Sequence, residues 1–259
     1  MKAYISFSSL GYQKEPSEFI VNLHKICAFY ARKNFGEIHL ITDTLSLQYF
    51  KNIKWDSVST FLDDVPKDYP QVWSLSKLYA FNHIAQKKEP FIHIDYDVII
   101  WTKLKDSFLN SEVFVQSPED ILGHVYEIEK FIVNCPNRHL LKSTMPGFSY
   151  NMGIFGGTNT DFIAKYSKEA IDFVLDRQNA FFWKKYDKYS KGWCKAVLAE
   201  QYFLTGAAEY YNQKVTPLFP KWPTEEMAAV AGYTHLMQAK NQSNTKIKLQ
   251  MLLDLIEKK

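Results

Sequence analysis

Residues 91–101 read Phe91-Ile92-His93-Ile94-Asp95-Tyr96-Asp97-Val98-Ile99-Ile100-Trp101. In this apolar stretch two aspartates, Asp95 and Asp97, stand one residue apart. The residues before them have the composition of a buried strand, so both carboxylates fall at its carboxyl end. Burying an unpaired carboxylate is costly, and a divalent cation is a usual partner for two oxygen ligands. We therefore expect a Mn²⁺ or Mg²⁺ site; the alternative is that one aspartate caps the next element and the other lies on the surface.

Strands and helices alternate along the chain before this pair. Residues 16–34 carry apolar side chains at helical spacing after Pro16, and Gly36 ends the predicted helix. Similar patterns predict strands over 3–8, 38–42, 57–62 and 91–94 and further helices over 45–51 and 73–84. This order predicts an α/β fold with a central, mostly parallel sheet flanked by helices. In such sheets, ligands bind at the carboxyl ends of the strands, where Asp95 and Asp97 fall.

The second half of the chain is less regular. Its patterns predict strands over 113–116 and 150–157 and helices over 119–141, 161–177, 196–204 and 246–259. We expect the last of these, an amphipathic C-terminal helix, to pack back on the domain. Its apolar side carries Ile247, Met251, Leu252, Leu255 and Ile256. No repeat and no linker interrupts the sequence. One domain over residues 1–259 is therefore the predicted organisation.

The composition narrows the class of protein. A hydrophobic fraction of 46% supplies a large core, and a net charge of only +3 argues against a nucleic-acid partner. The three cysteines, Cys27, Cys135 and Cys194, are widely spaced and without a CxxC pattern, as is usual for reduced thiols. The N-terminus lacks the apolar run of a signal peptide, and no segment approaches the roughly 18 apolar residues of a membrane span. We expect a soluble, cytoplasmic protein, and a peripheral contact at the inner membrane face stays open.

Polar residues and glycines recur at three places in the second half. Asn151, Gly153, Gly156 and Gly157 lie in one apolar strand, where glycine permits close approach of a ligand or a bulge at a sheet edge. Glu200 and Gln201 lie on a helix, where they could serve a site or a solvated face. His235 could be a metal ligand or a half-buried histidine without that role.

Two other enzyme classes with paired or clustered acidic residues fit poorly. Haloacid-dehalogenase-type phosphatases carry such a pair near the N-terminus, with a threonine shortly after it. Here the pair follows the fourth predicted strand, and Val98 and two isoleucines come after the pair. Sugar nucleotidyltransferases have a glycine-rich loop and an arginine after the first strand. Residues 8–12 of this chain read Ser-Ser-Leu-Gly-Tyr, with one glycine and no basic residue.

The motifs together resemble the GT-A fold of glycosyltransferases. Asp95-Tyr96-Asp97 looks like its DxD motif, and the helix and strand before it are similar to those of retaining families 8 and 32. Residues 150–157 resemble the asparagine- and glycine-rich strand that these families place beside the donor sugar. Ala199-Glu200-Gln201 looks like the acidic helix start of family 8, and Tyr233-Thr234-His235 resembles its late metal-binding histidine. The order of the four segments covers roughly residues 1–240, and their concurrence is more specific than any one motif.

This resemblance implies a metal-dependent, hexosyltransferase-like enzyme. It would move a sugar from a nucleoside-diphosphate sugar, with UDP-sugar the expected donor, to an acceptor hydroxyl with retention of configuration. Residues 1–101 would bind the nucleotide, and residues 102–245 would bind the donor sugar and the acceptor. The acceptor, whether a glycan, a lipid-linked sugar or a protein, is not specified by the sequence.

The resemblance also implies a role for each candidate residue. Asp95, Asp97 and His235 would hold Mn²⁺ or Mg²⁺, which stabilises negative charge on the departing diphosphate. The remaining donor-binding candidates are Ser8, Tyr12, Lys77, Gly153, Gly156 and Gly157, in addition to Asp95. The catalytic candidates beside the donor sugar are Glu200, Gln201 and Asn151.

The chain departs from both families in two segments. Family 32 has an acidic residue and an arginine on the helix before DxD, where this chain has Ser76-Lys77-Leu78-Tyr79. Family 8 continues after its late histidine with a glycine and Lys-Pro-Trp, of which residues 236–241 keep only a lysine. We therefore expect the fold, but a place outside these well-marked families.

Two other classes of function stay open. One is a non-catalytic protein of the same fold that binds a nucleotide sugar or a glycan. The other is a protein that docks on a membrane or a partner through the run of aromatic residues and lysines over 181–193 and the C-terminal helix. The clustered carboxylates favour catalysis over both.

Overall fold

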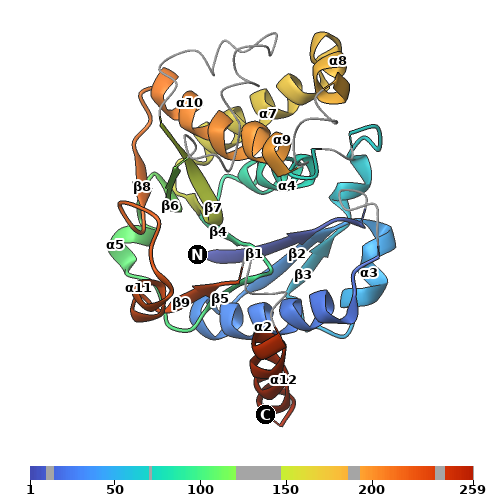
Figure 1. Cartoon of the computed structure of the whole chain (residues 1–259), viewed down its shortest axis with the longest axis vertical. Helices are drawn as coiled ribbons and strands as arrows, with labels where there is room; N and C mark the ends of the chain where they lie inside the picture. The colour runs from blue at the N-terminus through green and yellow to red at the C-terminus, as the bar shows by residue number, and fades with distance from the viewer. Residues whose placement is uncertain (10–14, 70–71, 121–146, 186–192, 237–242, 259) are drawn as a thin grey trace.

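The computed structural model describes residues 1–9, 15–69, 72–120, 147–185, 193–236 and 243–258. In this part of the chain, seven strands form one sheet, in the order β3-β2-β1-β4-β7-β6-β8 (Figure 1). Their bounds are Ser57–Ser59 (β3), Ile38–Thr42 (β2), Lys2–Phe7 (β1), Phe91–Ile94 (β4), Phe148–Gly157 (β7), Val113–Asp120 (β6) and Val215–Pro217 (β8). The first four strands in this order are parallel, β7 runs antiparallel to both of its neighbours, and β6 is parallel to β8. The predicted α/β fold with a mostly parallel sheet is confirmed.

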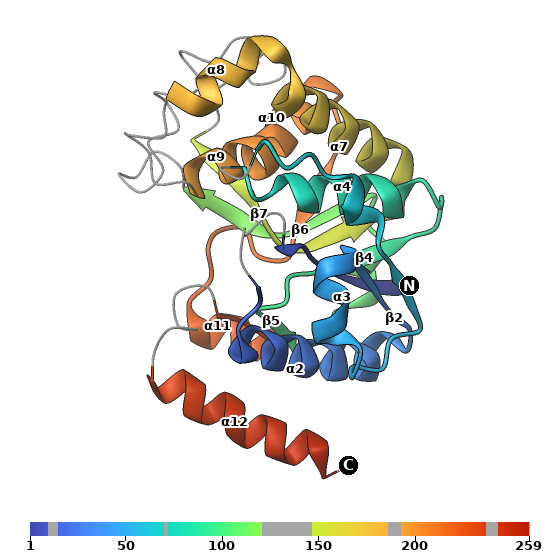
Figure 2. The ribbon, with the colours of Figure 1, turned by 90° about the vertical axis from the view of Figure 1, so that its right-hand side faces the viewer.

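Helices cover both faces of the sheet. One face carries α4 (Leu75–Ala85), α7 (Thr160–Leu175) and α10 (Phe203–Tyr210), and the other carries α2 (Glu18–Phe35), as both ribbon views show (Figures 1 and 2). Successive side chains of β1 alternate between these two cores: Tyr4 packs with the α4 and α7 side, and Ile5 packs with the α2 side. This alternation is what a strand covered on both faces requires.

Local signals set the ends of the helices. Ser17 caps α2 by accepting a hydrogen bond from the N–H of Ile20, and Gly36 follows with a φ of 84° and donates to the carbonyl of Arg32. A positive φ at this position suits glycine. Asn159 caps α7 in the same way by accepting from the N–H of Phe162. The predicted helix over 16–34 therefore lies close to the observed α2.

A second, two-stranded sheet was not predicted. β5 (Val98–Ile100) begins directly after Asp97 and pairs antiparallel with β9 (Tyr233–His235), with Val98 opposite His235. The N–H of Leu236 also donates to the carbonyl of Asp97 over 2.9 Å. This pairing brings the end of β4 next to a segment near the C-terminus.

Some element bounds differ from the predicted ones. Glu119 and Asp120 belong to β6 rather than to a helix, because they continue the pairing with β7; the rest of that predicted helix lies outside the described residues. The third strand ends at Ser59 and is followed by a 3₁₀ turn over Phe61–Asp64.

The remaining short helices lie between these strands or near the C-terminus. They are α3 (Thr44–Phe50), α5 (Asp106–Leu109), α8 (Arg177–Lys185), α9 (Trp193–Val197) and α11 (Glu225–Val230). Strands from both predicted halves share the main sheet, since β4 pairs with β7.

The C-terminal helix α12 (Ser243–Glu257) packs on α2, as expected, and two of the five side chains expected on its packed side, Leu252 and Ile256, are partly buried there (Figure 2). Its fully buried contacts, Leu249 and Leu253, were not expected, and the other three expected side chains, Ile247, Met251 and Leu255, are exposed. Among the described residues, no helix is both long and apolar enough to cross a bilayer.

Candidate functional site

Asp95 and Asp97 follow β4, and their side chains have different surroundings. The N–H of Asp95 donates to the carbonyl of Gly153 over 2.9 Å, and its own carbonyl accepts from the N–H of Val98 over 2.9 Å. These two bonds fix a tight turn between β4 and β5. The Asp95 carboxylate is partly exposed and contacts Lys77, whereas Asp97 is only 6% exposed and lies beside His235.

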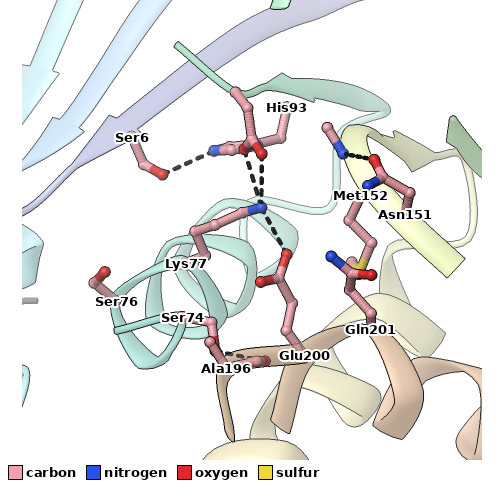
Figure 3. Close-up of polar contacts among 12 residues, drawn as sticks. Ser6, Ser74, Ser76, Lys77, His93, Asn151, Met152, Ala196, Glu200 and Gln201 are labelled. Carbon is pink, nitrogen blue, oxygen red and sulfur yellow. Dashed lines mark hydrogen bonds and ion pairs between the residues drawn. The ribbon is translucent and has the colours of Figure 1, made fainter. Parts of the chain in front are cut away.

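Lys77, on α4, lies between two carboxylates (Figure 3). Its Nζ is 3.0 Å from Oδ1 and 3.1 Å from Oδ2 of Asp95, and 2.6 Å from Oε1 of Glu200. Glu200 lies on a π-helical turn, η4 (Leu198–Tyr202), between α9 and α10. Single turns of this kind often occur at functional sites. The ion pairs therefore join the end of β4 to two helices that are far apart in the sequence.

One cation shared by two carboxylates produces opposing pKa shifts. Burial alone lowers the pKa of Lys77, but the negative charges of Asp95 and Glu200 outweigh it and raise the pKa above the usual value. Burial raises the pKa of Glu200 to about 7, and the attraction of Lys77 offsets this only in part. The site therefore holds a permanently charged lysine beside a buried acid that gains and loses its proton near neutral pH.

This raised pKa predicts that Glu200 reduces the stability of the fold at alkaline pH. Between the usual value of 4.5 and about 7, the folded protein holds the Glu200 proton more tightly than the unfolded chain does. The contribution of Glu200 to the free energy of unfolding therefore falls as the pH rises through this window. Glu200→Gln stays neutral, so the melting temperature of this variant relative to the native protein is expected to be more favourable at pH 8 than at pH 5.

The measurement is thermal unfolding of both proteins at the two pH values. Glu225→Gln, at an exposed position of α11, is the matched control and should show no such difference. A relative melting temperature of Glu200→Gln that is equal at both pH values, or better at pH 5, would contradict the raised pKa.

Asp97, His235 and Gln116 form a second polar group. Oδ1 of Asp97 is 3.7 Å from Nε2 of His235, and Nδ1 of His235 donates to Oε1 of Gln116 over 2.9 Å. Gln116 lies on β6 and is buried. The sequence did not point to it, although a buried polar residue at the end of a predicted strand was a usable signal.

Two residues of this group, Asp97 and His235, are spaced as ligands of one divalent cation would be. Two ligand atoms that are each about 2.1 Å from one ion lie roughly 3 to 4 Å apart, a range that includes the separation of Asp97 and His235. Among the described residues, no three His, Cys, Asp or Glu side chains form a metal-binding group of their own. Mg²⁺ is commonly held by one or two carboxylates together with substrate phosphates and waters, so a pair of protein ligands is compatible with it.

The predicted asparagine- and glycine-rich strand corresponds to β7. Oδ1 of Asn151 accepts from the N–H of Gly153 over 3.0 Å, and its amide nitrogen donates to Glu119 over 3.3 Å. A Cβ on Gly156 would lie 2.0 Å from the carbonyl oxygen of Phe91, and one on Gly157 would lie 2.0 Å from that of Glu112. Close packing within the sheet thus accounts for Gly156 and Gly157, and their contact with a donor stays a prediction.

Of the other predicted site residues, Ser8 and Gln201 lie in the described part of the chain and Tyr12 does not. Ser8 is buried just after β1, and Gln201 is partly exposed and accepts from the hydroxyl of Ser149 over 3.4 Å. Tyr12 and residues 186–192 of the run of aromatic residues and lysines lie outside the described residues.

Two further residues near the carboxylates were not predicted. His93 is buried on β4, accepts or donates a hydrogen bond of 2.8 Å with Ser6, and has Nδ1 3.8 Å from Asp95 (Figure 3). Burial, and then the charge of Lys77, lower the pKa of His93 well below its usual value, so the ring is neutral. Trp222 is 40% exposed, and its ring centroid is 6.3 Å from that of His235.

Comparisons with known proteins matched one family model and many chains of solved structures. The model of a family described as "Family of unknown function (DUF6734)" matches residues 7–253. Among solved structures, the apo form of mouse xyloside xylosyltransferase 1 overlaps with a TM-score of 0.44 at 12% identity, over 84% of this chain and 85% of that one. None of the curated proteins matches significantly.

Proposed function

Since the chain belongs to DUF6734, a family of unknown function, we propose its function from the geometry of its site. The protein is a metal-dependent glycosyltransferase that moves a sugar from a nucleoside-diphosphate sugar to an acceptor hydroxyl. UDP-sugar is the proposed donor, and the anomeric configuration is retained. The acceptor is a glycan, a lipid-linked sugar or a protein.

The observation that carries this proposal is the arrangement of Asp95 and Asp97. They stand at the carboxyl end of a parallel strand, where ligands of α/β proteins bind. Asp97 lies beside the imidazole of His235 on β9, and Asp95 lies beside the cationic Lys77 on α4. The two carboxylates can therefore have different roles toward one donor. Asp97 can bind the cation that accompanies it, and Asp95 can contact a charged or hydroxylated group of the donor itself.

Asp97 and His235 are the residues proposed to hold Mn²⁺ or Mg²⁺, with Asp95 beside them. When bound, the ion offsets negative charge on the two phosphates of the donor, and this favours departure of the nucleoside diphosphate. The carboxylate and imidazole atoms fix where the phosphates bind.

Lys77, Glu200 and Gln201 are proposed to act on the other side of the donor. Lys77 supplies a fixed positive charge close to the phosphates, because its own partners keep it protonated. Glu200 holds Lys77 in place and, in its ionised form, favours positive charge that develops at the anomeric carbon. Gln201 is partly exposed and is proposed to bind hydroxyls of the donor sugar.

Asn151, the glycines and the first strand complete the proposed donor site. Asn151 orients the backbone of Gly153 rather than offering a free amide, because its Oδ1 already accepts from that N–H. Gly153 brings backbone close to the metal-binding pair. Ser8 and Tyr12 are proposed to bind the base and ribose after β1.

The test is release of UDP from a panel of UDP-sugars, with glucose, galactose, xylose and N-acetylglucosamine as the sugars, each with Mn²⁺, Mg²⁺ or EDTA. With at least one donor, the enzyme should release UDP by slow hydrolysis at a rate about tenfold or more above the rate without enzyme. EDTA should remove this activity. The anomer first formed, observed by NMR, reports retention or inversion. Binding of UDP without cleavage of any donor would instead support a non-catalytic nucleotide-sugar-binding protein.

A further inference from the structure

Gln116 stands opposite an irregular part of β7. Val115 pairs with Phe155 and Ser117 pairs with Asn151, so the one residue between them on β6 faces the three residues 152–154 on β7. Such bulges redirect side chains and are frequent beside functional sites. On the side of β6 away from β7, the carbonyl of Gln116 accepts a hydrogen bond from the N–H of Phe219 over 3.1 Å, which fixes its backbone.

The side chain of Gln116 determines which nitrogen of His235 carries the proton. Its Oε1 lies 2.9 Å from Nδ1 of His235, and an amide oxygen can only accept. Nδ1 is therefore the protonated nitrogen of the neutral ring. The lone pair is on Nε2, the nitrogen that lies 3.7 Å from Oδ1 of Asp97. This tautomer is the one that presents Nε2 to a cation shared with Asp97.

The backbone of β7 at Gly153 packs closely against the side chains of Gln116 and His235. A Cβ on Gly153 would lie 2.7 Å from Oε1 of Gln116 and 2.7 Å from Cε1 of His235, so the backbone of Gly153 packs directly on the contact between the two side chains. Gly153 itself is fixed by Asn151 at its N–H and by Asp95 at its carbonyl. The same short segment therefore positions Asp95 and confines Gln116 and His235.

We propose that Gln116 is a positioning residue: it holds His235 in the Nδ1–H tautomer, so that Nε2 and the carboxylate of Asp97 face one divalent cation. Gly153 supplies the space that this contact requires. The cation part of this inference rests on the proposed function, whereas the tautomer of His235 does not.

The first measurement is the tautomer of His235, by ¹H–¹⁵N NMR of protein labelled with ¹⁵N-histidine, without metal or nucleotide. The protein has seven histidines, and the signals of His235 are assigned as those lost in His235→Asn. The native ring should carry its proton on Nδ1. Gln116→Leu, which cannot accept, and Gln116→Asn, which is too short to reach, should both lose this preference, and Gln116→Glu should keep it.

The second measurement is the affinity for Mn²⁺ alone, from the loss of the free-ion signal in electron paramagnetic resonance. Removing the group that orients a metal-bound histidine weakens metal binding by about 10- to 100-fold, so Gln116→Leu and Gly153→Ala are both expected to show a loss in this range. Gln250→Leu, an exposed glutamine on α12, is the matched control and should bind Mn²⁺ as the native protein does.

Three results separate this inference from the proposed function. A native ring protonated on Nε2, or a Gln116→Leu variant that keeps both the Nδ1–H tautomer and native Mn²⁺ affinity, would overturn the role of Gln116. The expected tautomer together with its loss in Gln116→Leu supports that role. If the native protein with that tautomer binds no Mn²⁺, the positioning role of Gln116 stands, and the metal site of the proposed function is contradicted.

Discussion

Asp97→Asn is expected to lower metal-dependent release of UDP from the preferred donor at least roughly a thousand-fold. Asparagine keeps the size of the side chain and the backbone contact with Leu236, but it removes the negative charge beside His235. A bound metal ion contributes several kcal/mol of charge stabilisation in the transition state, and each 1.4 kcal/mol is about tenfold in rate. Loss of the carboxylate should remove most of this contribution.

Initial rates at saturating Mn²⁺ measure this effect, and thermal unfolding shows that the variant is folded. Asp254→Asn on α12 is the matched control, because it removes an exposed carboxylate far from β4 and should leave the rate unchanged. A folded Asp97→Asn variant with native turnover would show that Asp97 does not hold the metal.

Of all these variants, Lys77→Met is expected to lower the free energy of unfolding the most. Lys77 is 13% exposed and contacts Asp95 and the almost fully buried Glu200. Methionine fills a similar volume but leaves these carboxylates without a cation. Removing one partner of a buried ion pair costs about 3–5 kcal/mol of unfolding free energy, because the remaining charge is buried without compensation.

Denaturant unfolding at pH 8 measures this loss. Lys88→Met is the matched control: Lys88 also pairs with an aspartate, Asp161, but both side chains are exposed, and such pairs contribute about 0–1 kcal/mol. Adding Glu200→Gln to Lys77→Met should recover part of the stability. If Lys77→Met is as stable as Lys88→Met, the two carboxylates do not depend on Lys77.

Local patterns predicted the elements that bury a continuous face. The strands over 38–42 and 91–94 have the predicted bounds, and the helix predicted over 16–34 is observed over Glu18–Phe35. Each of these segments carries its own periodicity and end signals. The short strands β5, β8 and β9 were missed because three residues show no period, and only pairing with distant segments makes them strands.

The candidate site was predictable in its residues but not in its contacts. Lys77 was expected among the donor-binding residues, and the structure pairs it with Asp95 and Glu200, which lie on separate elements. The proximity of His235 to Asp97 was implied by resemblance alone, and it depends on the pairing of β5 with β9. Gln116 could not be assigned a partner from the sequence, because its neighbour on β9 is set by the tertiary fold.

The most direct test of the account is the thermal stability of the native protein with UDP, measured with Mn²⁺ and again with EDTA. A ligand at about one hundred times its dissociation constant adds roughly 2.7 kcal/mol to the unfolding free energy, which shifts the melting temperature measurably. The account predicts a shift with UDP and Mn²⁺ that EDTA abolishes. Stabilisation by UDP that is unchanged in EDTA, or no stabilisation by UDP in either condition, would contradict a metal-dependent nucleotide site at Asp95 and Asp97.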